Sequence, residues 1–512
     1  MTPGSSSITS YAGFLAMAVG MFLAILDIQI VASSLIEIQA DLAIPPTRLS
    51  YLQTIYLIAE IIAIAATGRL ARALSTRWLF TLGLVGFVLA SAACAASTSY
   101  QMLYAARAVQ GFFGGVLIPT VFSAVFLMFP LERQAVATAI AGTFAMLAPT
   151  LGPFVGGWIT EHLSWHWLFL INVAPGLIAA AVVAAWVRID TPDGKSLRAT
   201  DMASLALAVV FLAGLELTLK EAPGRGWLSG ASLSLLTVTL ASGVLLVRRC
   251  LKVPEPLIEV RAFRDLDFAI GAWFSFVLGM ALFGAVYLMP LFLGHVRGHG
   301  SLAIGTIMMV TGAAQLITAP LAAFLERRWA AKPMTAAGFA LFAAGLIMNG
   351  FAAPAWDFEE LFAPQLLRGV ALLFCLLPIT RLALGHLSSH DVPQASSLFN
   401  LMRNVGGAVG LALIDTIVET RTADHAAAIV AKLEAGDRDM AAFVGLPLER
   451  FTGEPLGPMD EYTQSLAAPM VERAAATMSF NEAWLLLGAL VGLSLLALPW
   501  VGREKRIAPL KG

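Results

Sequence analysis

Long apolar segments recur along the whole chain, and they restrict its fold more than any other feature of the sequence. A helix of about 20 apolar residues crosses the roughly 30 Å hydrocarbon core of a bilayer. Backbone groups cannot stay unpaired in lipid, and these segments are too long for barrel strands, so each predicts a transmembrane helix. We expect an all-α membrane protein with fourteen spans, at about 12–36, 49–68, 78–97, 101–128, 135–160, 165–187, 202–219, 229–247, 268–293, 302–325, 333–352, 361–384, 395–418 and 482–502.

The loops give the orientation of these spans, because short cytoplasmic loops carry an excess of lysine and arginine. With the N-terminus placed in the cytoplasm, 20 of the 32 lysines and arginines lie in cytoplasmic loops or tails. The short outer loops hold only 4, namely Arg48, Lys220, Arg225 and Arg297. This bias predicts that both termini are cytoplasmic and that the long segment at about 420–481 lies outside.

A shift of 258 residues, without gaps, superimposes parts of the two halves of the chain. It places Gly111 on Gly369 in one pair of spans, and Gly152 on Gly410 in another. Parallel repeats of this kind form one known transporter architecture, in which the substrate site lies between the halves near the midplane. We expect three parts: a six-helix bundle (1–190), two inserted helices with linkers (191–262) and a second six-helix bundle (263–512) that includes the outer segment.

Two acidic residues lie inside predicted transmembrane helices, where side chains that face the lipid are apolar. Asp27 is in the middle of MFLAILDIQIVASSL, and Glu60 is within YLIAEIIAIAATG. A charge at a helix centre costs roughly 2.5–3.5 kcal/mol on insertion scales, so such residues usually face an aqueous cavity or a partner. Because burial favours the protonated form of a carboxylic acid, both are candidate proton carriers. The alternative is a static partner for a buried arginine or a backbone donor.

Three arginines also fall inside predicted spans. Arg107 and Arg403 each require a carboxylate, a carbonyl or water, because arginine does not lose its proton. An Arg107–Asp27 pair would act as a proton-gated switch, and a fixed structural pair is the alternative. Arg368 is nearer an outer end, where a long side chain reaches the interface. We expect Glu216 and Asp415 to sit near outer ends, where the interface tolerates charge.

Several classes of protein are excluded or disfavoured by what the chain contains. Charged residues are only 13% of the total, against about 25% in a soluble domain. No basic tract suggests nucleic acid, and Cys94, Cys250 and Cys375 make no metal-ligand spacing, so they are expected to be buried small side chains. The first ten residues lack the lysine or arginine of a cleavable signal. No nucleophile–base pair or phosphate-binding loop indicates an enzyme, and no cofactor or metal is expected.

Glycines are the remaining signal in the spans. Gly111-Phe-Phe-Gly-Gly115, Gly152-Pro-Phe-Val-Gly156 and Gly406-Gly-Ala-Val-Gly410 are patterns of small residues that let helix backbones approach closely. Pro149 and Pro153 remove backbone donors and should bend their span.

At this point the motifs resemble the major facilitator superfamily, and in particular its fourteen-span drug:proton antiporters of the EmrB/QacA type. The segments that carry the resemblance are LDIQIVASSL (26–35), RAVQGFFGGVLIP (107–119), LAPTLGPFVGGWI (147–159), SWHWLFLINVAPG (164–176) and ASSLFNLMRNVGGAVGLAL (395–413). The resemblance covers essentially the whole chain. Its most specific part is the span-5 antiporter motif, matched through Gly152, Pro153, Gly156 and Gly157.

The resemblance implies proton-coupled efflux of small hydrophobic or amphipathic compounds across a bacterial inner membrane, by alternating access. Asp27 and Glu60 would take the proton, and Arg107 would couple protonation to rearrangement. It also implies contact with membrane lipid, and a periplasmic adaptor and an outer-membrane channel as partners. The residues expected to line the substrate cavity are Gln29, Phe112, Met146, Gln315, Phe399, Arg403 and Asn404.

One loop departs from the family pattern. Between spans 2 and 3 the family has close to G-x-L-A-D-R-x-G-R-R, whereas this chain has Arg72 where the acid is expected. Closure of the transporter on its cytoplasmic side would then depend on contacts of Arg69, Arg72 and Arg77 with helix C-termini or lipid phosphate.

Three alternatives to drug efflux stay open at this point. The first is export of an endogenous lipid or a fatty acid, which an apolar cavity would also accept. The second is import or uniport of a polar nutrient, which the span-5 motif and the scarcity of polar residues in the spans disfavour. The third is a membrane scaffold or receptor. Asp27, Glu60 and Arg107 disfavour it, because charged residues inside spans are costly and such a protein has no use for them.

The long outer segment has helical patterns of its own. TADHAAAIVAKLEA (422–435) places apolar residues on one face at helical spacing, and Gly436 is expected to end that helix. A second short helix is predicted at 470–476, leading into the last span. The segment is either a solvated tether or, as the resemblance implies, a docking surface for the adaptor.

Overall fold

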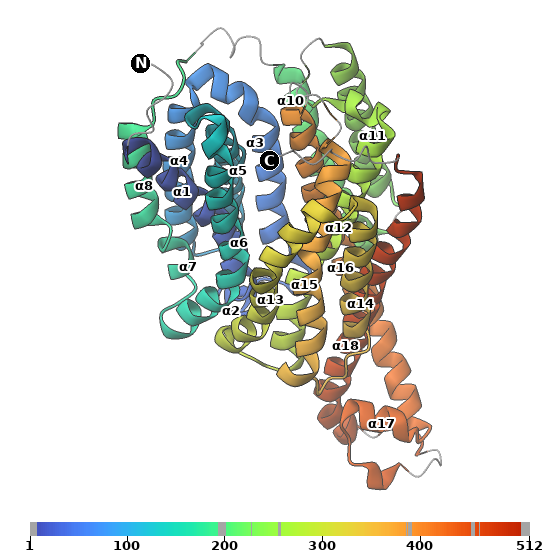
Figure 1. Cartoon of the computed structure of the whole chain (residues 1–512). Coiled ribbons are helices and arrows are strands. Elements are labelled where there is room, and N and C mark those ends of the chain that lie inside the picture. Colours follow the sequence, from blue (N-terminus) through green and yellow to red (C-terminus); the bar gives the residue numbers. More distant parts are fainter. Residues whose placement is uncertain are drawn as a thin grey trace.

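The computed structural model describes residues 8–192, 201–226, 228–253, 256, 258–385, 387, 392–451, 456–459 and 461–502. Every regular element in those residues is helical (Figure 1). The long helices are α1 (Ile8–Ala32), α3 (Tyr51–Leu74), α4 (Thr76–Ala95), α5 (Tyr100–Met128), α6 (Leu131–His162), α8 (Val173–Trp186), α10 (Met202–Arg225), α11 (Gly230–Lys252), α12 (Leu266–Leu291), α13 (Ser301–Arg328), α14 (Ala331–Asn349), α15 (Phe358–Leu384), α16 (Val392–Glu434) and α18 (Glu461–Ser494). The short ones are α2 (Leu35–Asp41), η1 (Pro46–Arg48), α7 (Trp167–Leu170), η2 (Val260–Arg264), η3 (Phe292–Val296), α17 (Arg438–Val444), η4 (Leu448–Arg450) and η5 (Leu495–Trp500).

The helices occur where the apolar segments predict them. Thirteen helical segments of the described residues are long and apolar enough to cross a membrane. The predicted span at 49–68 corresponds to α3, whose described apolar stretch, Tyr51–Ile64, is shorter. The span predicted at 165–187 is divided into α7 and α8. A helix therefore lies at each of the fourteen predicted spans, and the predicted fold class is confirmed.

Glycines set the packing within each half, and they do so in corresponding places. A Cβ atom on Gly111 of α5 would lie 2.3 Å from the carbonyl oxygen of Tyr56 on α3. A Cβ atom on Gly369 of α15 would likewise lie 2.3 Å from the carbonyl oxygen of Thr311 on α13. Real side chains do not approach backbone so closely, so only glycine permits these helix pairs. The pair α5–α3 thus has its counterpart in α15–α13, as the 258-residue repeat requires.

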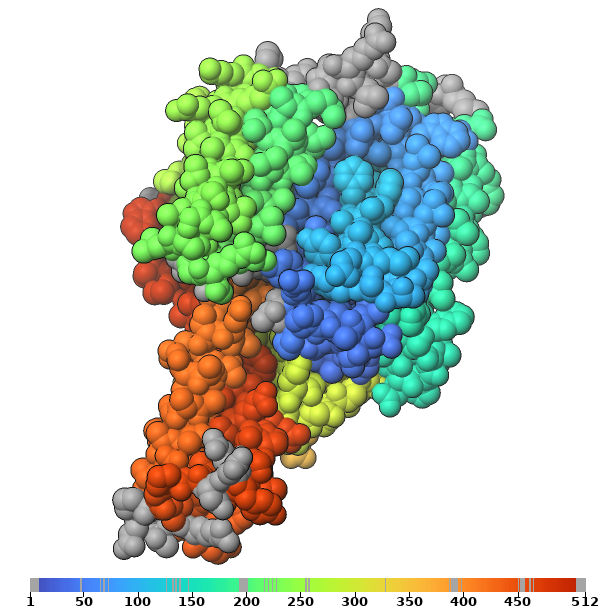
Figure 2. Space-filling model, turned by 180° about the vertical axis from the view of Figure 1, so that it is seen from behind, coloured from blue at the N-terminus to red at the C-terminus, as the bar shows by residue number. Residues whose placement is uncertain are grey.

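The two inserted helices form a hairpin beside the bundle. α10 and α11 pack on each other, and α10 also contacts α3 and α16. Leu212 of α10 is buried in an apolar cluster with Ile58 and Ile61 of α3. Figure 2 shows the hairpin, in green, against the blue helices of the first half. The hairpin therefore covers the seam where α3 of one half meets α16 of the other.

A helical projection, here called the stalk, consists of residues 420–451 and 456–480, with the gaps already given. α16 has 43 residues, which makes it about 64 Å long at 1.5 Å per residue. That is about twice the thickness of the hydrocarbon core. The stalk leaves the bundle at the end opposite to the start of α1 (Figures 1 and 2). We call this end of the bundle the stalk side.

The stalk corrects one prediction about its helices. The helices expected at 422–435 and 470–476 are not separate, because α16 continues unbroken to Glu434 and α18 already begins at Glu461. Helical periodicity located the helices, but nothing in the sequence interrupts them at the bilayer edge. Gly436, with φ +82°, follows the end of α16 as predicted.

The stalk has a small hydrophobic core of its own, to which α16, α17 and α18 contribute. Its buried members are Ile429, Leu433, Ala441, Val444, Phe451, Ala467, Val471, Ala474 and Ala475. The prediction of buried cysteines is also confirmed, since Cys94, Cys250 and Cys375 are buried and free.

Candidate proton-coupling site

A buried ion pair joins α1 and α5 inside the first half. The Asp27 carboxylate accepts a hydrogen bond from Nη1 of Arg107, and the two side chains are 0% and 1% exposed. Apolar helix faces bring both residues into the middle of the bundle, and neither charge could stay there alone. The structure therefore confirms the pairing of Asp27 with Arg107 that the sequence suggested.

Three further polar side chains complete the cluster around Asp27. Its Oδ1 atom accepts hydrogen bonds from Nε2 of Gln110, at 2.9 Å, and from Nδ2 of Asn172, at 2.7 Å. Gln110 also donates to Oγ of Ser91 at 2.8 Å, and its Oε1 accepts from Arg107 at 2.7 Å. The carboxylate is thus held by Arg107 and Gln110 of α5 and by Asn172 in the turn before α8, and Ser91 of α4 binds Gln110 behind it.

Two aromatic rings also lie against the guanidinium of Arg107. Its central carbon lies 4.3 Å from the ring centroid of Tyr56 and 5.8 Å from that of Phe169. Nε donates to the carbonyl oxygen of Leu52 at 3.4 Å. Cation–π contacts contribute about 0.5–2 kcal/mol each. They provide the cation with contacts that do not depend on the charge of Asp27.

The cluster is not saturated with hydrogen bonds. Nη2 of Arg107 and Oδ1 of Asn172 are buried and have no hydrogen-bond partner among the described residues. A protonated Asp27 would no longer attract the guanidinium electrostatically, so Arg107 could turn toward other acceptors. Such an arrangement links the charge of one carboxyl group to the position of one long side chain.

Glu60, the second predicted proton carrier, lies in a different place. It is 4% exposed on α3, and it interacts electrostatically with Arg403 of α16 and with Arg107. Arg403 also donates to the side-chain oxygen of Asn400. Since α3 and α16 belong to different halves and contact each other, Glu60 and Arg403 place opposite charges on the two sides of this contact.

The antiporter-motif glycines of α6 face two helices at once. A Cβ on Gly156 would lie 2.4 Å from the carbonyl oxygen of Ile30 on α1, in the same half. A Cβ on Gly157 would lie 2.2 Å from the carbonyl oxygen of Ser301 on α13, in the other half. Gly152 packs on the side chain of Gln29. α6 continues unbroken through Pro149 and Pro153.

Polar contacts between the halves gather on the stalk side. Oγ1 of Thr150 donates to the carbonyl oxygen of Gly312 at 3.1 Å, and the backbone N–H of Ser301 donates to Oε1 of Glu37 at 2.9 Å. The Gly305 backbone packs against the Pro153 carbonyl. The described structure is therefore joined across the two halves on the stalk side.

Asp415 takes part in the same closure. Its carboxylate accepts hydrogen bonds from Oγ of Ser50 and, at 3.0 Å, from the hydroxyl of Tyr287. We predicted that Asp415 would be a charge tolerated at the membrane–water interface. The structure instead gives its carboxylate hydrogen-bond partners from both halves, Ser50 and Tyr287. Glu216 was predicted to be similar, but its side chain lies outside the described part of the chain.

The predicted cavity residues come from five helices, α1, α5 and α6 of the first half and α13 and α16 of the second. Gln315, Phe399 and Asn404 are buried, at 7%, 2% and 6% exposure. Gln29 of α1, Phe112 of α5 and Arg403 are half-buried. The side chain of Met146 lies outside the described residues. A shared cavity for these residues remains a prediction.

Two predictions about arginines had different outcomes. Arg77 meets a helix C-terminus as expected, because its Nη2 donates to the carbonyl oxygen of Ala184 on α8; the side chains of Arg69 and Arg72 are not among those described. The prediction that Arg368 reaches the interface is wrong, since its side chain is only 4% exposed. Arg368 is packed between α14 and α18, so its position along the span did not indicate its direction.

Asn172, Ser91 and Tyr56 belong to the cluster but are inconspicuous in the sequence. Asn172 and Tyr56 lie in predominantly apolar segments, and Ser91 is a small residue in an apolar span. A polar amide within LFLINVAPG was the available signal, because such a group must find a partner in lipid. Only tertiary packing brings Asn172 to Asp27, Ser91 to Gln110 and Tyr56 to Arg107.

Comparisons with known proteins show which family the chain belongs to. Residues 17–411 match the Major Facilitator Superfamily. The chain is 40% identical to the colistin resistance protein EmrB of Acinetobacter baumannii over 81% of this chain and 82% of that protein. It is 27% identical to the fatty acid resistance protein FarB of Neisseria gonorrhoeae over 80% and 81% of the two chains. It is 26% identical to the multidrug export protein EmrB of Escherichia coli K12 over 96% and 94%.

A solved structure shares the fold at low sequence identity. It is a bacterial homologue of the human lysosomal transporter Spinster, inward-facing and unoccupied, with a TM-score of 0.61 and 13% identity. The alignment covers 98% of this chain and 100% of that one. The match to the superfamily over most of the length, the EmrB relatives and the shared fold lead to one conclusion: this chain belongs to the Major Facilitator Superfamily.

Proposed function

We propose that this protein exports small hydrophobic or amphipathic compounds across a bacterial inner membrane in exchange for protons. The observation that carries the proposal is the buried cluster of Asp27, Arg107, Gln110 and Asn172. Burying a charge pair is costly, and a transporter driven by protons makes use of a carboxyl group that can become neutral. The names of the EmrB relatives support export as the direction.

In this proposal the two six-helix halves, 1–190 and 263–512, rock around a central site, and 191–262 supplies the inserted hairpin. Proton entry to Asp27 releases Arg107, and the opposite charges of Glu60 and Arg403 respond to the same change. The glycine contacts between α6 and α13 close the stalk side. If that side is periplasmic, the described structure is closed to the outside.

The test is transport in inverted membrane vesicles, with and without an imposed pH gradient. We expect uptake of hydrophobic test compounds only with the gradient, and no uptake in vesicles lacking the protein. The panel should include a fatty acid, because the relationship to FarB favours fatty acid export as the second candidate. Gradient-independent equilibration of a polar nutrient would contradict the proposal.

The topology of the proposal makes a separate prediction. A reporter joined to the C-terminal end and another inserted at Gly436 should report opposite sides of the membrane, with Gly436 outside. The reason is the charge bias of the loops, together with the position of Gly436 in the stalk. Activity of a cytoplasmic reporter at both positions would show that the stalk side faces the cytoplasm.

We further propose that the stalk docks a periplasmic adaptor that leads to an outer-membrane channel. The stalk buries a hydrophobic core of its own. Tyr462 and Leu466 of α18 are not part of that core and are 72% and 61% exposed. Exposed large apolar side chains on a rigid helix are suited to binding a partner helix. The folded stalk therefore presents an apolar surface to which an adaptor can bind without any part of the stalk unfolding.

This docking surface gives a prediction with a control in the same segment. Replacing Tyr462 and Leu466 together with serine should lower efflux from whole cells at least several-fold and leave transport in inner-membrane vesicles unchanged. The matched control is Lys432→Ser, an exposed polar position on the stalk part of α16. Equal loss in cells and vesicles would mean that the stalk serves the transporter itself, and undiminished efflux from cells would remove the docking role.

A further inference from the structure

The second half contains a buried arginine that lacks the carboxylate its counterpart site has. The 258-residue shift that relates the halves places Arg107 on Gln365, and Gln110 on Arg368. Packing supports this correspondence, because the Arg107 and Gln365 side chains both donate to backbone carbonyls of the neighbouring helix, at Leu52 and Ile307. The cation of the second site is thus displaced by one helical turn, from 365 to 368.

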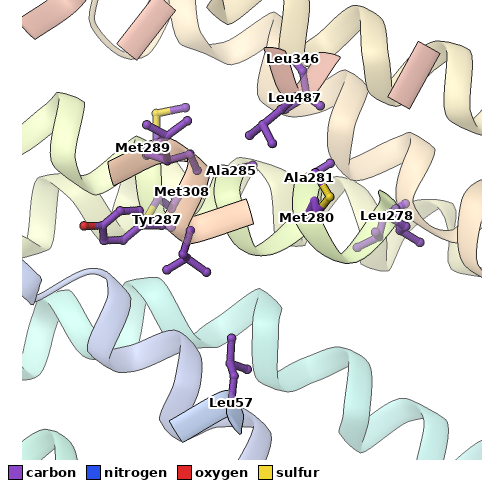
Figure 3. Close-up of a cluster of buried hydrophobic side chains, with 14 of the residues drawn as sticks. Leu57, Leu278, Met280, Ala281, Ala285, Tyr287, Met289, Met308, Leu346 and Leu487 are labelled. Carbon is purple, nitrogen blue, oxygen red and sulfur yellow. The ribbon is translucent and has the colours of Figure 1, made fainter. Parts of the chain in front are cut away.

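The acid of the first site has no counterpart. The same shift places Asp27 on Ala285 of α12. Ala285 is buried in an apolar cluster, where Figure 3 shows Leu346 of α14 and Leu487 of α18 close to α12. The second half therefore keeps a buried cation but replaces the buried anion with a methyl group.

Arg368 has an aromatic partner in place of an anion. Its guanidinium carbon lies 5.2 Å from the ring centroid of Trp484 on α18. Nε is buried without a hydrogen-bond partner, and no described residue forms an ion pair with Arg368. Arginine stays protonated in proteins, and a buried charge without a counter-charge is strongly unfavourable. A neutral ring does not remove that charge.

A second unsatisfied group lies on the adjoining helix. Gly345 of α14 packs against the Arg368 side chain, since a Cβ on Gly345 would lie 2.7 Å from Cγ of Arg368. Asn349 follows one turn later on the same face of α14, and it corresponds to Ser91 of the first cluster. Asn349 is 1% exposed, and both its Nδ2 and its Oδ1 lack hydrogen-bond partners among the described residues. Its amide N–H groups are donors with nothing to bind.

We infer that Arg368, with the Asn349 amide and Trp484 beside it, binds a small inorganic anion of chloride size between α14, α15 and α18. The guanidinium supplies the charge, and the amide supplies a neutral donor. Glycine at 345 lets α14 approach Arg368, and Arg368 and Asn349 are only 4% and 1% exposed. A lipid phosphate offers the same chemistry, but its headgroup and chains do not suit a site with 4% exposure.

The experiment measures the thermal midpoint, Tm, of the full chain purified in detergent, as gluconate is replaced by chloride or bromide at constant ionic strength. Binding to the folded state alone raises Tm in a saturable way. We expect a rise of a few degrees in the wild type and none in Arg368→Gln. In gluconate, Arg368→Gln should be more stable than the wild type, because it removes an uncompensated buried charge.

Arg403→Gln is the matched control, since Arg403 is in the same half but has Glu60 as its electrostatic partner. It should keep the chloride-dependent rise. Asn349→Leu should weaken the chloride response and leave Arg368 in place. If Arg368→Gln does not fold, the binding of radioactive chloride to the wild type is measured instead. The proposal expects saturable binding, and no saturable binding would overturn it.

Two further outcomes would also overturn it. One is a wild-type Tm that is equal in chloride and gluconate, which would mean that water alone solvates the guanidinium. The other is a rise that requires added anionic phospholipid and not chloride, which would identify a lipid site.

Discussion

Replacing Asp27 with asparagine is expected to abolish transport driven by a pH gradient, down to the level of vesicles without the protein. Asparagine has the same size, and its Oδ1 can still accept from Arg107, but it cannot take up or release a proton. Breaking a buried ion pair costs about 3–5 kcal/mol, so some stability is lost. The variant should nevertheless insert and unfold cooperatively, because it resembles the protonated state of the proposed cycle.

The control for this variant is Asp201→Asn. Asp201 also forms an ion pair, with Arg249 at 2.8 Å, but the pair belongs to the inserted hairpin. Transport should change little there. If the Asp27→Asn protein still concentrates substrate against its gradient, Asp27 is structural, and Glu60 becomes the candidate carrier.

Gly156→Ala should lower both transport and thermal stability. The added Cβ would lie 2.4 Å from the carbonyl oxygen of Ile30 and 2.6 Å from Oγ of Ser33. The first of these is backbone, so α1 and α6 must separate, and overpacking of this kind costs about 1–3 kcal/mol. The measurement is Tm of the purified protein together with vesicle uptake.

The same helix provides the control. A Cβ on Gly142 of α6 would have nothing within 4 Å of it, and alanine is a better helix former than glycine by about 1 kcal/mol. Gly142→Ala should therefore leave Tm unchanged or raise it. Equal effects of the two substitutions would show that helix propensity, and not the contact with α1, determines the result.

The sequence predicted the fold because the bilayer imposes it. Apolar length located the fourteen spans, and glycine patterns indicated where α6 and α5 approach their neighbours. The stalk was predicted less well, since helical periodicity at 422–435 does not tell whether a helix continues from the span before it. α16 continues unbroken through that segment.

The candidate site was predicted in part, for a related reason. Charged residues in apolar spans stand out, which is how Asp27, Glu60 and Arg107 were found. Asn172 is less conspicuous, and only tertiary packing brings it to Asp27. The direction of a side chain within its span is likewise a tertiary property, so Arg368 was expected at the interface and is found buried.

The measurement that tests proton-coupled export most directly is proton movement in proteoliposomes that contain only this protein. A pH gradient is imposed, a transported compound is added, and the internal pH is followed with a trapped dye. The wild type should dissipate the gradient only when the compound is present, and the Asp27→Asn variant should not respond to it. Transport of the compound by the wild type with no accompanying change in internal pH would contradict proton exchange.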